Sequence, residues 1–541
     1  MAFFSFIDKV RSSVSKVEAP PAEAHLNYMA GVSYDVKSPI TRLRLAASTC
    51  FFGEPMYYQP ADEKNTRPAK APHPANLSDA QRDYLRKTLD AVDPQAWRSL
   101  TPAALLESTI DEALAHDAEA TLREAVRLRN EEHIRVTPQV ILVRAANHAD
   151  VKGTGLVRKY ARSIVRRADE PAVGLAYQMF RYGKPIPNAL KKAWRDVLQS
   201  FDDYALAKYR LEGRGAKTVD VVNLVHPKST AVDKLAKGEA KTTGRTWESI
   251  LSSRGSNRTA WRKAMNVMGH MAMLRNIRNM LDAGIRGEEI VPRLLNGAET
   301  GKQLPFRYYS AYKAVEEKAP PVVLDAIEKC LVKSLGELPR FSGRVMVLAD
   351  NSGSAQGTAT SSMGTMKVST IGNLTGIVAG MRADEGYLGV FGDSLETMPV
   401  RKDSSIFDQL KHAEHIAKGI GLGTENGVWT FLDRAIRKHE HWDSIFILSD
   451  MQAGHGGLYG TNPRKYREYG WGHDEKYIDV AKLVSAYRKR VNPKVKVFLV
   501  QIAGYKDTLV PEFYDRTYIL GGWGEGLLRF AAEMSKIEKA S

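Results

Sequence analysis

Two different spacings of apolar residues divide this chain into two parts. Between about residues 28 and 338, apolar residues recur three and four positions apart, which predicts amphipathic helices. Helices of about ten to fifteen residues joined by short turns favour an α-solenoid of stacked helix pairs, although no strict sequence period is present. The predicted helices are Ile40–Phe51, Ala80–Val92, Pro102–Ala115, Ala120–Arg129, Pro138–Asn147, Gly155–Val165, Val173–Phe180, Ala189–Leu198, Asp203–Tyr209, Asp220–Val225, Ala260–Ala283 and Val322–Ser334.

Beyond the linker at Leu338-Pro339-Arg340, short apolar runs alternate with helical stretches, which indicates a doubly wound α/β domain. The expected layout is an N-terminal arm (1–27), a helical domain (28–338) with a polar spacer at Pro60–Asn76, and an α/β domain (341–541). The predicted strands are Arg344–Ala349, Gly386–Phe391, Ser444–Ser449, Val495–Ile502 and Arg516–Leu520. The predicted helices between and after them are Val368–Met381, Ser405–Lys418, Glu425–His439, Tyr477–Arg490 and Glu525–Met534.

Basic residues are concentrated in one window of the helical part. The chain carries 78 Lys and Arg against 62 Asp and Glu, a net charge of +16. Residues 151–280 hold 26 basic and 10 acidic residues, so this window alone carries a net +16, whereas residues 341–541, with 25 basic and 23 acidic residues, are close to neutral. A strongly basic surface attracts polyanions through counterion release, and nucleic acid is the polyanion we expect. A solvated surface that serves solubility is the alternative.

The remaining chemistry of the chain is sparse. Cys50 and Cys330 lie in apolar surroundings and are expected to be core residues, which fits a reducing cytosol and a cytoplasmic location. No run of about 18 apolar residues occurs, so we expect a soluble protein without a membrane partner. The histidines near residues 412–415 and 439–441 do not complete a zinc set, and neither a Walker motif nor Gly-x-Ser-x-Gly is present. With no catalytic dyad, the sequence does not predict an enzyme.

The clearest chemical motif is Asp-x-Ser-x-Ser, formed by Asp350, Ser352 and Ser354 directly after an apolar strand. Ligands of open α/β sheets bind at the carboxyl ends of the strands, so one carboxylate and two hydroxyls would converge there. This oxygen set suits a hard divalent cation, Mg²⁺ first and Mn²⁺ as the alternative. Two later pieces extend the set, because Thr424 lies on a Gly-rich loop and Asp450 ends a second apolar strand. A polar strand-to-helix turn is the alternative interpretation of Asp-x-Ser-x-Ser alone.

This order of residues resembles the metal-ion-dependent adhesion site of von Willebrand factor A domains. The resemblance implies that Ser352, Ser354 and Thr424 coordinate the cation, while Asp350 and Asp450 act directly or through water. It also implies an open coordination position that an acidic group of a protein ligand would complete.

In the helical part, an ordered series of segments runs from Arg42–Ala46 through Asn188–Trp194 to Met273–Met280. This series is similar to the TROVE module of the Ro autoantigen family. A TROVE module followed by a von Willebrand A domain is the layout of the Ro proteins, so the chain resembles bacterial members of that family over about residues 28–535. The spacer Pro60–Asn76 departs from the family pattern. The matching segments are Arg42–Ala46, Tyr57-Tyr58, Asn188–Trp194, Ala205–Arg210, Val221–Lys228, Thr246–Glu248 and Met273–Met280.

The resemblance carries expectations about fold and partners. It implies a ring of HEAT-like helical repeats closed by the Rossmann-like A domain. Small noncoding Y RNA, or a Y-like RNA, would bind the basic outer surface, and single-stranded 3′ ends of misfolded RNAs would enter the central hole. In bacterial members the RNA tethers the exoribonuclease polynucleotide phosphorylase, so RNA quality control and processing form the expected role.

The basic window supplies the candidate RNA contacts. Arg158, Arg162 and Arg166 are spaced four apart and would share one helix face. The resemblance adds Lys191-Lys192 as the basic pair of an RNA-contacting helix and His226 as a loop contact. The full predicted set is Arg158, Lys159, Arg162, Arg166, Lys191, Lys192, Arg195, His226, Lys228, Arg262, Lys263, Arg275 and Arg278. Aromatic residues interleave with these cations and could stack on bases, although most are expected in the core; they are Tyr160, Trp194, Tyr209, Trp247 and Trp261.

Two other functions compete with an RNA-binding scaffold. One is a metal-dependent protein-adhesion module whose solenoid also binds protein, and the charge of the 151–280 window argues against it. The other is a metal-dependent nuclease. Such enzymes cluster several carboxylates around two metals, whereas this motif is rich in hydroxyls and has two aspartates, so a nuclease is disfavoured.

Overall fold

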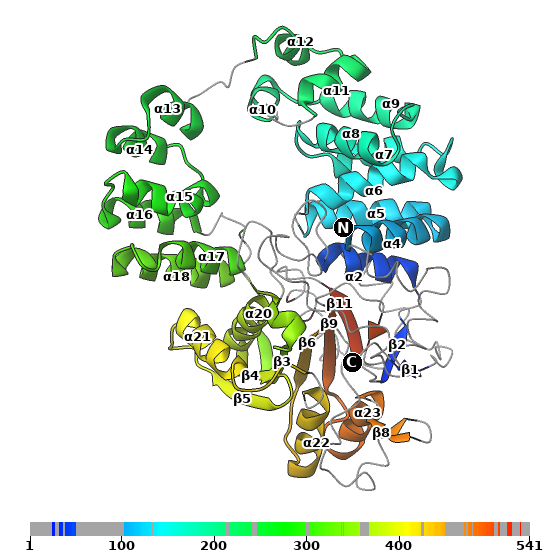
Figure 1. Ribbon diagram of the computed structural model, residues 1–541, viewed down its shortest axis with the longest axis vertical. Coiled ribbons are helices and arrows are strands. Elements are labelled where there is room, and N and C mark those ends of the chain that lie inside the picture. The colour runs from blue at the N-terminus through cyan, green and yellow to red at the C-terminus, as the bar shows by residue number, and fades with distance from the viewer. Residues whose placement is uncertain are drawn as a thin grey trace, which may run out of the picture. The chain divides into compact units, whose positions relative to one another are not determined.

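The computed structural model of the chain describes residues 24–26, 32–35, 38–49, 102–132, 134–210, 216–240, 246–298, 303, 305–336, 338, 340–357, 367–423, 427–449, 470–471, 474–478, 480–501, 507–508, 517–521, 528 and 531. The chain divides into two compact units, one of residues 1–50, 54–105 and 339–541 and the other of residues 51–53 and 106–338 (Figure 1). The predicted helix Ala80–Val92, the spacer Pro60–Asn76, the pair Tyr57-Tyr58, Cys50 and most of the predicted arm lie outside the described residues.

A series of helices runs from Pro102 to Leu335. Their bounds are α4 (Pro102–His116), α5 (Ala118–Asn130), α6 (Val136–Asn147), α7 (Leu156–Ile164), α8 (Glu170–Arg181), α9 (Asn188–Leu198), α10 (Asp203–Lys208), α11 (Thr218–Val225), α12 (Thr230–Ala236), α13 (Trp247–Arg254), α14 (Arg258–Met265), α15 (His270–Asp282), α16 (Gly287–Gly297), α17 (Pro305–Val315) and α18 (Pro321–Leu335), with a short 3₁₀ turn at Ala149–Val151.

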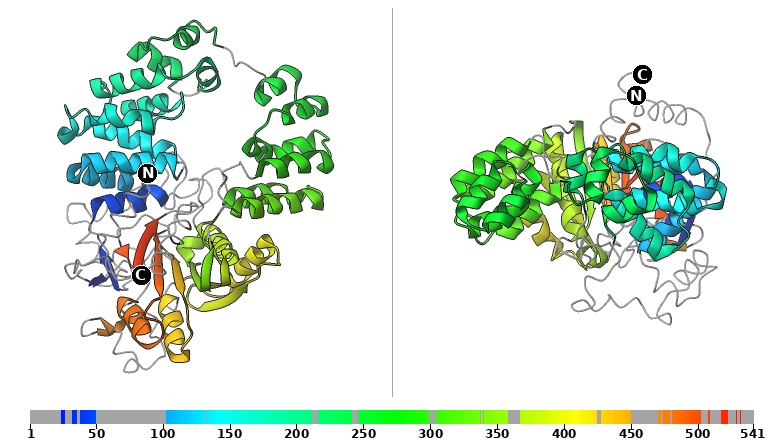
Figure 2. Two further views of the ribbon diagram at one scale, coloured as in Figure 1. Left: turned by 180° about the vertical axis from the view of Figure 1, so that it is seen from behind. Right: turned by 90° about the horizontal axis from the view of Figure 1, so that it is seen from above.

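The helices stack in two layers, as Figure 2 shows for the helical unit. α7 packs against both α5 and α9 in one layer, and α8 packs against α6 and α11 in the other. Further along the chain the same arrangement recurs, with α15 on α17 and α16 on α18. The predicted solenoid of stacked helix pairs is therefore confirmed.

Buried aromatic side chains hold the layers together. Trp194 of α9 is fully buried, and Gly174 of α8 faces it. A Cβ atom at Gly174 would lie 3.0 Å from Cζ2 of Trp194, so the glycine leaves room for the indole. Several helices begin at side-chain caps; for example, Asp117 accepts a hydrogen bond of 2.8 Å from the backbone N–H of Ala120 at the start of α5.

The structure changes two features of the predicted helical pattern. The predicted helix Ala260–Ala283 is two helices, α14 and α15, and the second begins after Gly269, whose backbone is extended. The helices α12, α13, α16 and α17 were not predicted. α12 has seven residues, too few to show a period, and α16 contains Pro292, a residue that normally argues against a helix.

A six-stranded sheet forms the centre of the other unit. Its strands are β3 (Phe341–Asp350), β4 (Ala383–Phe391), β5 (Leu395–Val400), β6 (Ser444–Ser449), β9 (Lys496–Gln501) and β11 (Thr517–Gly521). They are ordered β11-β9-β6-β3-β4-β5, and all neighbours are parallel except β4 and β5. The chain crosses from β3 to β4 on one side and then to β6 on the other, so the strand order reverses at β3.

Helices cover both faces of this sheet. Alternate residues of β3 point to opposite faces, because side chains alternate along a strand. Met346 and Leu348 pack in the cluster that holds α22 (Val428–Lys438) and α23 (Val480–Arg490). Val347 faces Gly376 of α20 (Val368–Arg382), which packs in turn on α21 (Ile406–Ala417). The doubly wound α/β prediction is confirmed.

Short elements complete this unit. α2 (Pro39–Thr49) packs against β11, and β1 (Ala24–Leu26), β2 (Val32–Asp35) and β10 (Asp507–Thr508) form a small sheet. The predicted helix Tyr477–Arg490 begins later, at Val480, because residues up to Ile478 belong to β8 (Asp474–Ile478), which pairs with β7 (Gly470–Trp471). The antiparallel edge strand β5 was not predicted. No helix among the described residues is long and apolar enough to span a membrane.

Candidate nucleic-acid interface and candidate metal centre

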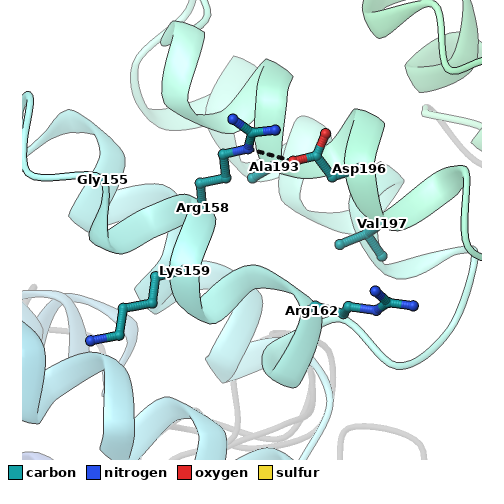
Figure 3. A pocket seen from close by; sticks show the side chains of 7 residues that line it. All are labelled: Gly155, Arg158, Lys159, Arg162, Ala193, Asp196 and Val197. Carbon is teal, nitrogen blue, oxygen red and sulfur yellow. Dashed lines mark hydrogen bonds and ion pairs between the residues drawn. The ribbon is translucent and has the colours of Figure 1, made fainter.

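Helices α7 and α9 border a cavity of about 400 Å³ whose lining is strongly basic (Figure 3). α7 begins after Gly155, which has a φ of 77°. Its apolar residues Val157, Ala161 and Ile164 are buried, and this spacing turns the cations of the helix outward. The residues that line the cavity are Gly155, Arg158, Lys159, Arg162, Ala193, Asp196 and Val197.

The three cations of α7 differ in their ion pairs. Nε of Arg158 donates to Asp196 of α9 at 2.5 Å, and Asp196 raises the pKa of this guanidinium. Nζ of Lys159 lies 2.7 Å from a carboxylate oxygen of Glu119 on α5, and this hydrogen bond raises the pKa of the lysine. Arg162 is exposed and forms no ion pair with any residue that the structure describes. It is therefore the cavity cation whose charge is most available to an anion.

Arg166 corrects the predicted row of three arginines. α7 ends at Ile164, so Arg166 lies in the following turn rather than on the helix face of Arg158 and Arg162. Its backbone N–H donates at 2.7 Å to Glu170, while its side chain is exposed. The helix thus presents two of the three arginines as a row.

The second helix of the cavity carries the predicted Lys-Lys pair. Lys192 is exposed, whereas Lys191 and Arg195 are half-buried beside the core residue Trp194. Successive helical residues point about 100° apart, and this explains why the two lysines differ in exposure. Lys192 is therefore the stronger candidate contact of the pair.

The remaining predicted contacts lie on two other parts of the helical unit. His226 is exposed at the end of α11 and has a φ of 48°. The backbone carbonyl of Lys228 accepts a hydrogen bond of 3.2 Å from the side chain of Gln199, at the end of α9. The other four residues are all exposed on α14 and α15, helices that pack on each other; they are Arg262, Lys263, Arg275 and Arg278. Of these, Arg262 binds Glu289 through two hydrogen bonds of 2.6 and 3.0 Å.

Two of the five predicted stacking aromatics are unavailable, and the other three are only partly accessible. Trp194 and Trp261 are buried, and Tyr160, Tyr209 and Trp247 are half-buried. The most exposed aromatic side chain among the described residues is instead Phe180, at 84%. Sequence reasoning placed it at the end of an amphipathic helix and missed its exposure.

A buried carboxylate lies where β3 meets β6, at the point where the strand order reverses. Asp350 ends β3 and is 1% exposed. Its Oδ1 accepts the backbone N–H of Ser352 at 2.8 Å, and its Oδ2 accepts the hydroxyl of Ser449, at the end of β6, at 2.8 Å. The contact between Ser449 and Asp350 was not predicted. The one sequence signal for it is that Ser449 ends a predicted strand and precedes Asp450.

The loops around Asp350 are held by hydrogen bonds. The side-chain amides of Asn351 and Asn373 donate to each other at 2.9 Å. Asp393 accepts the backbone N–H groups of Leu422 and Gly423 at 3.0 and 2.9 Å, and the carbonyl of Leu422 accepts the N–H of Gly353 at 2.7 Å. The segment 421–423, which precedes Thr424, is therefore clamped against the start of the Asp-x-Ser-x-Ser turn.

The described part of this site fits a hard cation by the chemistry of its donors. Asp350 supplies a carboxylate and Ser449 a hydroxyl oxygen at one edge of the sheet, and Ser352, whose backbone N–H binds Asp350, is a second hydroxyl-bearing residue beside them. Ser354 lies in the short helix α19 (Gly353–Gly357), while Thr424 and Asp450 lie outside the described residues. No group of three or more His, Cys, Asp or Glu residues gathers within the described ranges.

Comparisons with known proteins agree with this architecture. The family model for the TROVE domain matches residues 240–323, a stretch that contains Arg262, Lys263, Arg275 and Arg278. The crystal structure of the Ro (RSR) protein of Deinococcus radiodurans matches with a TM-score of 0.54 at 13% sequence identity, over 79% of this chain and 93% of that chain. At this identity the match shows the fold. No curated protein matches the chain. The TROVE match and the shared fold confirm the resemblance that the sequence motifs indicate.

Proposed function

We propose that this chain, which has a TROVE domain and the fold of a Ro protein, is a scaffold that binds RNA. The observation that carries the proposal is the cavity between α7 and α9, where Arg158, Lys159 and Arg162 line one concave site. This site lies in the window of residues 151–280, which carries a net charge of +16. The proposal extends to the ligand class, which is a small, structured, Y-like RNA held on this surface together with single-stranded ends of misfolded RNA.

The geometry explains how phosphates would be held. Guanidinium groups bind phosphate oxygens through paired N–H donors, and each neutralised phosphate releases condensed counterions. Arg162 can bind a phosphate with its full charge, whereas the charges of Arg158 and Lys159 are partly compensated by their carboxylate partners Asp196 and Glu119. RNA affinity should therefore depend on individual cations as well as on the total charge.

The Lys191-Lys192 pair gives the test of this function. Replacing both by Ala should weaken binding of a structured RNA more than replacing Arg401 and Lys402, two exposed cations of the near-neutral part. Each lost phosphate contact should also make the slope of log K against log salt shallower by roughly 0.7 to 0.9. Binding curves by fluorescence anisotropy at several salt concentrations measure both quantities. Equal weakening by the two double variants would show that only net charge matters, which would contradict the site.

The expected role places the protein in cytoplasmic RNA quality control and processing, with RNA tethering the exoribonuclease polynucleotide phosphorylase. A tether of this kind predicts co-purification that is lost when the extract is treated with ribonuclease. Co-purification that survives complete RNA digestion would instead indicate a direct protein contact. We propose no chemical step for the protein itself.

A divalent cation, Mg²⁺ first and Mn²⁺ second, is proposed for the site at Asp350. The residues that would hold it are Asp350, Ser352, Ser354, Thr424 and Asp450. A bound cation would supply an open position for an acidic group, which is the chemistry of the second candidate function, protein adhesion. Its support is the buried carboxylate of Asp350, which ends β3 and accepts the hydroxyl of Ser449 at the end of β6.

A further inference from the structure

The last turn of α8 carries an unusual group of exposed apolar side chains. Phe180 is 84% exposed, the highest value among the large apolar residues that the structure describes, and its neighbours Met179 and Tyr182 are 43% and 38% exposed. A solvated phenyl ring contributes nothing to the core. Its exposure is therefore unexplained by folding alone.

The backbone around Phe180 is held in one conformation. Gln178 is buried, and its carbonyl accepts the N–H groups of Tyr182 and Gly183, both at 2.9 Å. Its side chain donates to the carbonyl of Gly183 at 3.1 Å and accepts from Asn147 at 2.7 Å. A ring on this turn is presented at a defined position, so less backbone entropy is lost when it binds a ligand.

Tyr182, two residues after Phe180, is also fixed. Its ring contacts the guanidinium of Arg144, with 5.8 Å between the ring centroid and Cζ, and packs edge-to-face on Tyr177 at 6.4 Å. Arg144 is 95% buried as a side chain and binds Asp111 and Tyr177. Arg144 and Tyr177 thus hold the Tyr182 ring in place, while 38% of the residue remains exposed.

Two cations lie close to these aromatic residues along the chain. Arg181 keeps 51% of its side chain exposed although it lies 3.4 Å from Glu107, and Lys184 is exposed two residues beyond Tyr182. Aromatic faces beside cations are the combination that binds single-stranded nucleic acid, because unpaired bases stack on the rings while phosphates contact the cations.

This patch belongs to the layer of α6, α8 and α11, whereas the cavity of Arg158, Lys159 and Arg162 lies between α7 and α9 of the other layer. We propose that Phe180, with Arg181, Tyr182 and Lys184 close to it along the chain, is a stacking platform for unpaired bases of single-stranded RNA. The proposal rests on RNA binding as the function and adds a second site that distinguishes single-stranded from paired RNA.

The test compares two RNAs, an unpaired oligonucleotide and a blunt hairpin, in binding to the full chain. Phe180→Ala should weaken binding of the unpaired RNA by about 5-fold to 100-fold, the range for loss of one stacked base, and leave the hairpin unchanged. The slope of log K against log salt should not change, because no phosphate contact is lost. Phe180→Trp should retain binding, and Phe180→Leu should not, since leucine keeps apolar area but has no π face. Val332→Ala, at a residue of α18 that is 46% exposed, is the matched control.

Photocrosslinking adds a readout that does not depend on affinity. An unpaired oligonucleotide that contains 5-iodouridine should crosslink at Phe180, mapped by mass spectrometry, and a large excess of the unlabelled oligonucleotide should abolish the crosslink. Phe180→Ala and the parent could bind unpaired RNA with equal affinity while hairpin binding is intact. That result would overturn the stacking platform but not the proposed function, and the patch would then be assigned to a protein contact. Failure of the parent chain to bind either RNA would overturn both.

Discussion

Arg162 provides the most direct measurement of how the cavity holds RNA. It is the exposed cavity cation that forms no ion pair with a described residue, so Arg162→Ala should remove one complete phosphate contact. One contact contributes roughly 0.8 to the slope of log K against log salt, so its loss should reduce affinity about 5-fold at 0.15 M salt and about 11-fold at 0.05 M. Arg158→Ala should cost less at both salt concentrations, because Asp196 already compensates part of the charge of Arg158.

The assay is anisotropy of a labelled structured RNA over a salt series, with the thermal midpoint of each variant as the folding control. Asp196→Asn is the complementary variant, because it releases Arg158 and removes an anion from the cavity. Its affinity should rise and its salt slope should steepen. If Arg158→Ala and Arg162→Ala produced the same change in slope, the ion pair with Asp196 would have no influence on binding. If neither variant changed the slope, phosphate binding in this cavity would be refuted.

Three further predictions concern the metal site, the loop beside it, and the ion pairs of Glu289. Asp350→Ala should abolish the thermal stabilisation that Mg²⁺ is expected to give the parent chain, and an identical Mg²⁺ response in both proteins would contradict the metal assignment. Gly421→Ala should lower the thermal midpoint, because Gly421 has a φ of 86° and an added Cβ would lie 2.1 Å from a carboxylate oxygen of Asp393. Gly419→Ala is the control and should have a much smaller effect, because the atom nearest to its added Cβ is 3.6 Å away. The pKa of Glu289 is lowered to about 2, mainly because its carboxylate accepts a hydrogen bond from Arg262. The ion pairs of Glu289 should therefore stabilise the fold fully above pH about 4.5, and this stabilisation should be lost as the pH falls toward 2. The difference in thermal midpoint between the parent and Glu289→Gln should accordingly stay constant from pH 7 to 5 and shrink below that range, and a difference that already shrinks between pH 7 and 5 would be evidence against this pairing.

Much of the architecture follows from local pattern. The strand Ser444–Ser449 was predicted with the bounds of β6, because a fully buried parallel strand is a short, continuous apolar run with polar ends. The helices α9 and α20 were predicted within one residue at each end, since their apolar spacing is regular. Asp-x-Ser-x-Ser was recognisable for the same reason, because the motif is contiguous and follows a strand.

Contacts between distant segments could not be predicted in this way. Ser449 and Asp350 are separated by 99 positions, and only the parallel register of β3 and β6 brings the hydroxyl within 2.8 Å of the carboxylate. The ends of α14 and α15 at the break before Gly269 likewise follow from packing, since the apolar spacing continues through the break.

Composition and local spacing therefore determined that the chain has a basic helical solenoid and a doubly wound sheet with a carboxylate at a strand end. Only the tertiary structure decided which cations are available. Arg158 and Arg162 share one helix and one residue type, yet Asp196 of α9 binds the first and no described carboxylate binds the second. Phe180 likewise belongs to an amphipathic helix, and only the tertiary structure shows that its side chain is exposed. The physical reason is that local sequence sets the direction of a side chain relative to its own helix, whereas its partners are set by the helices that pack beside it.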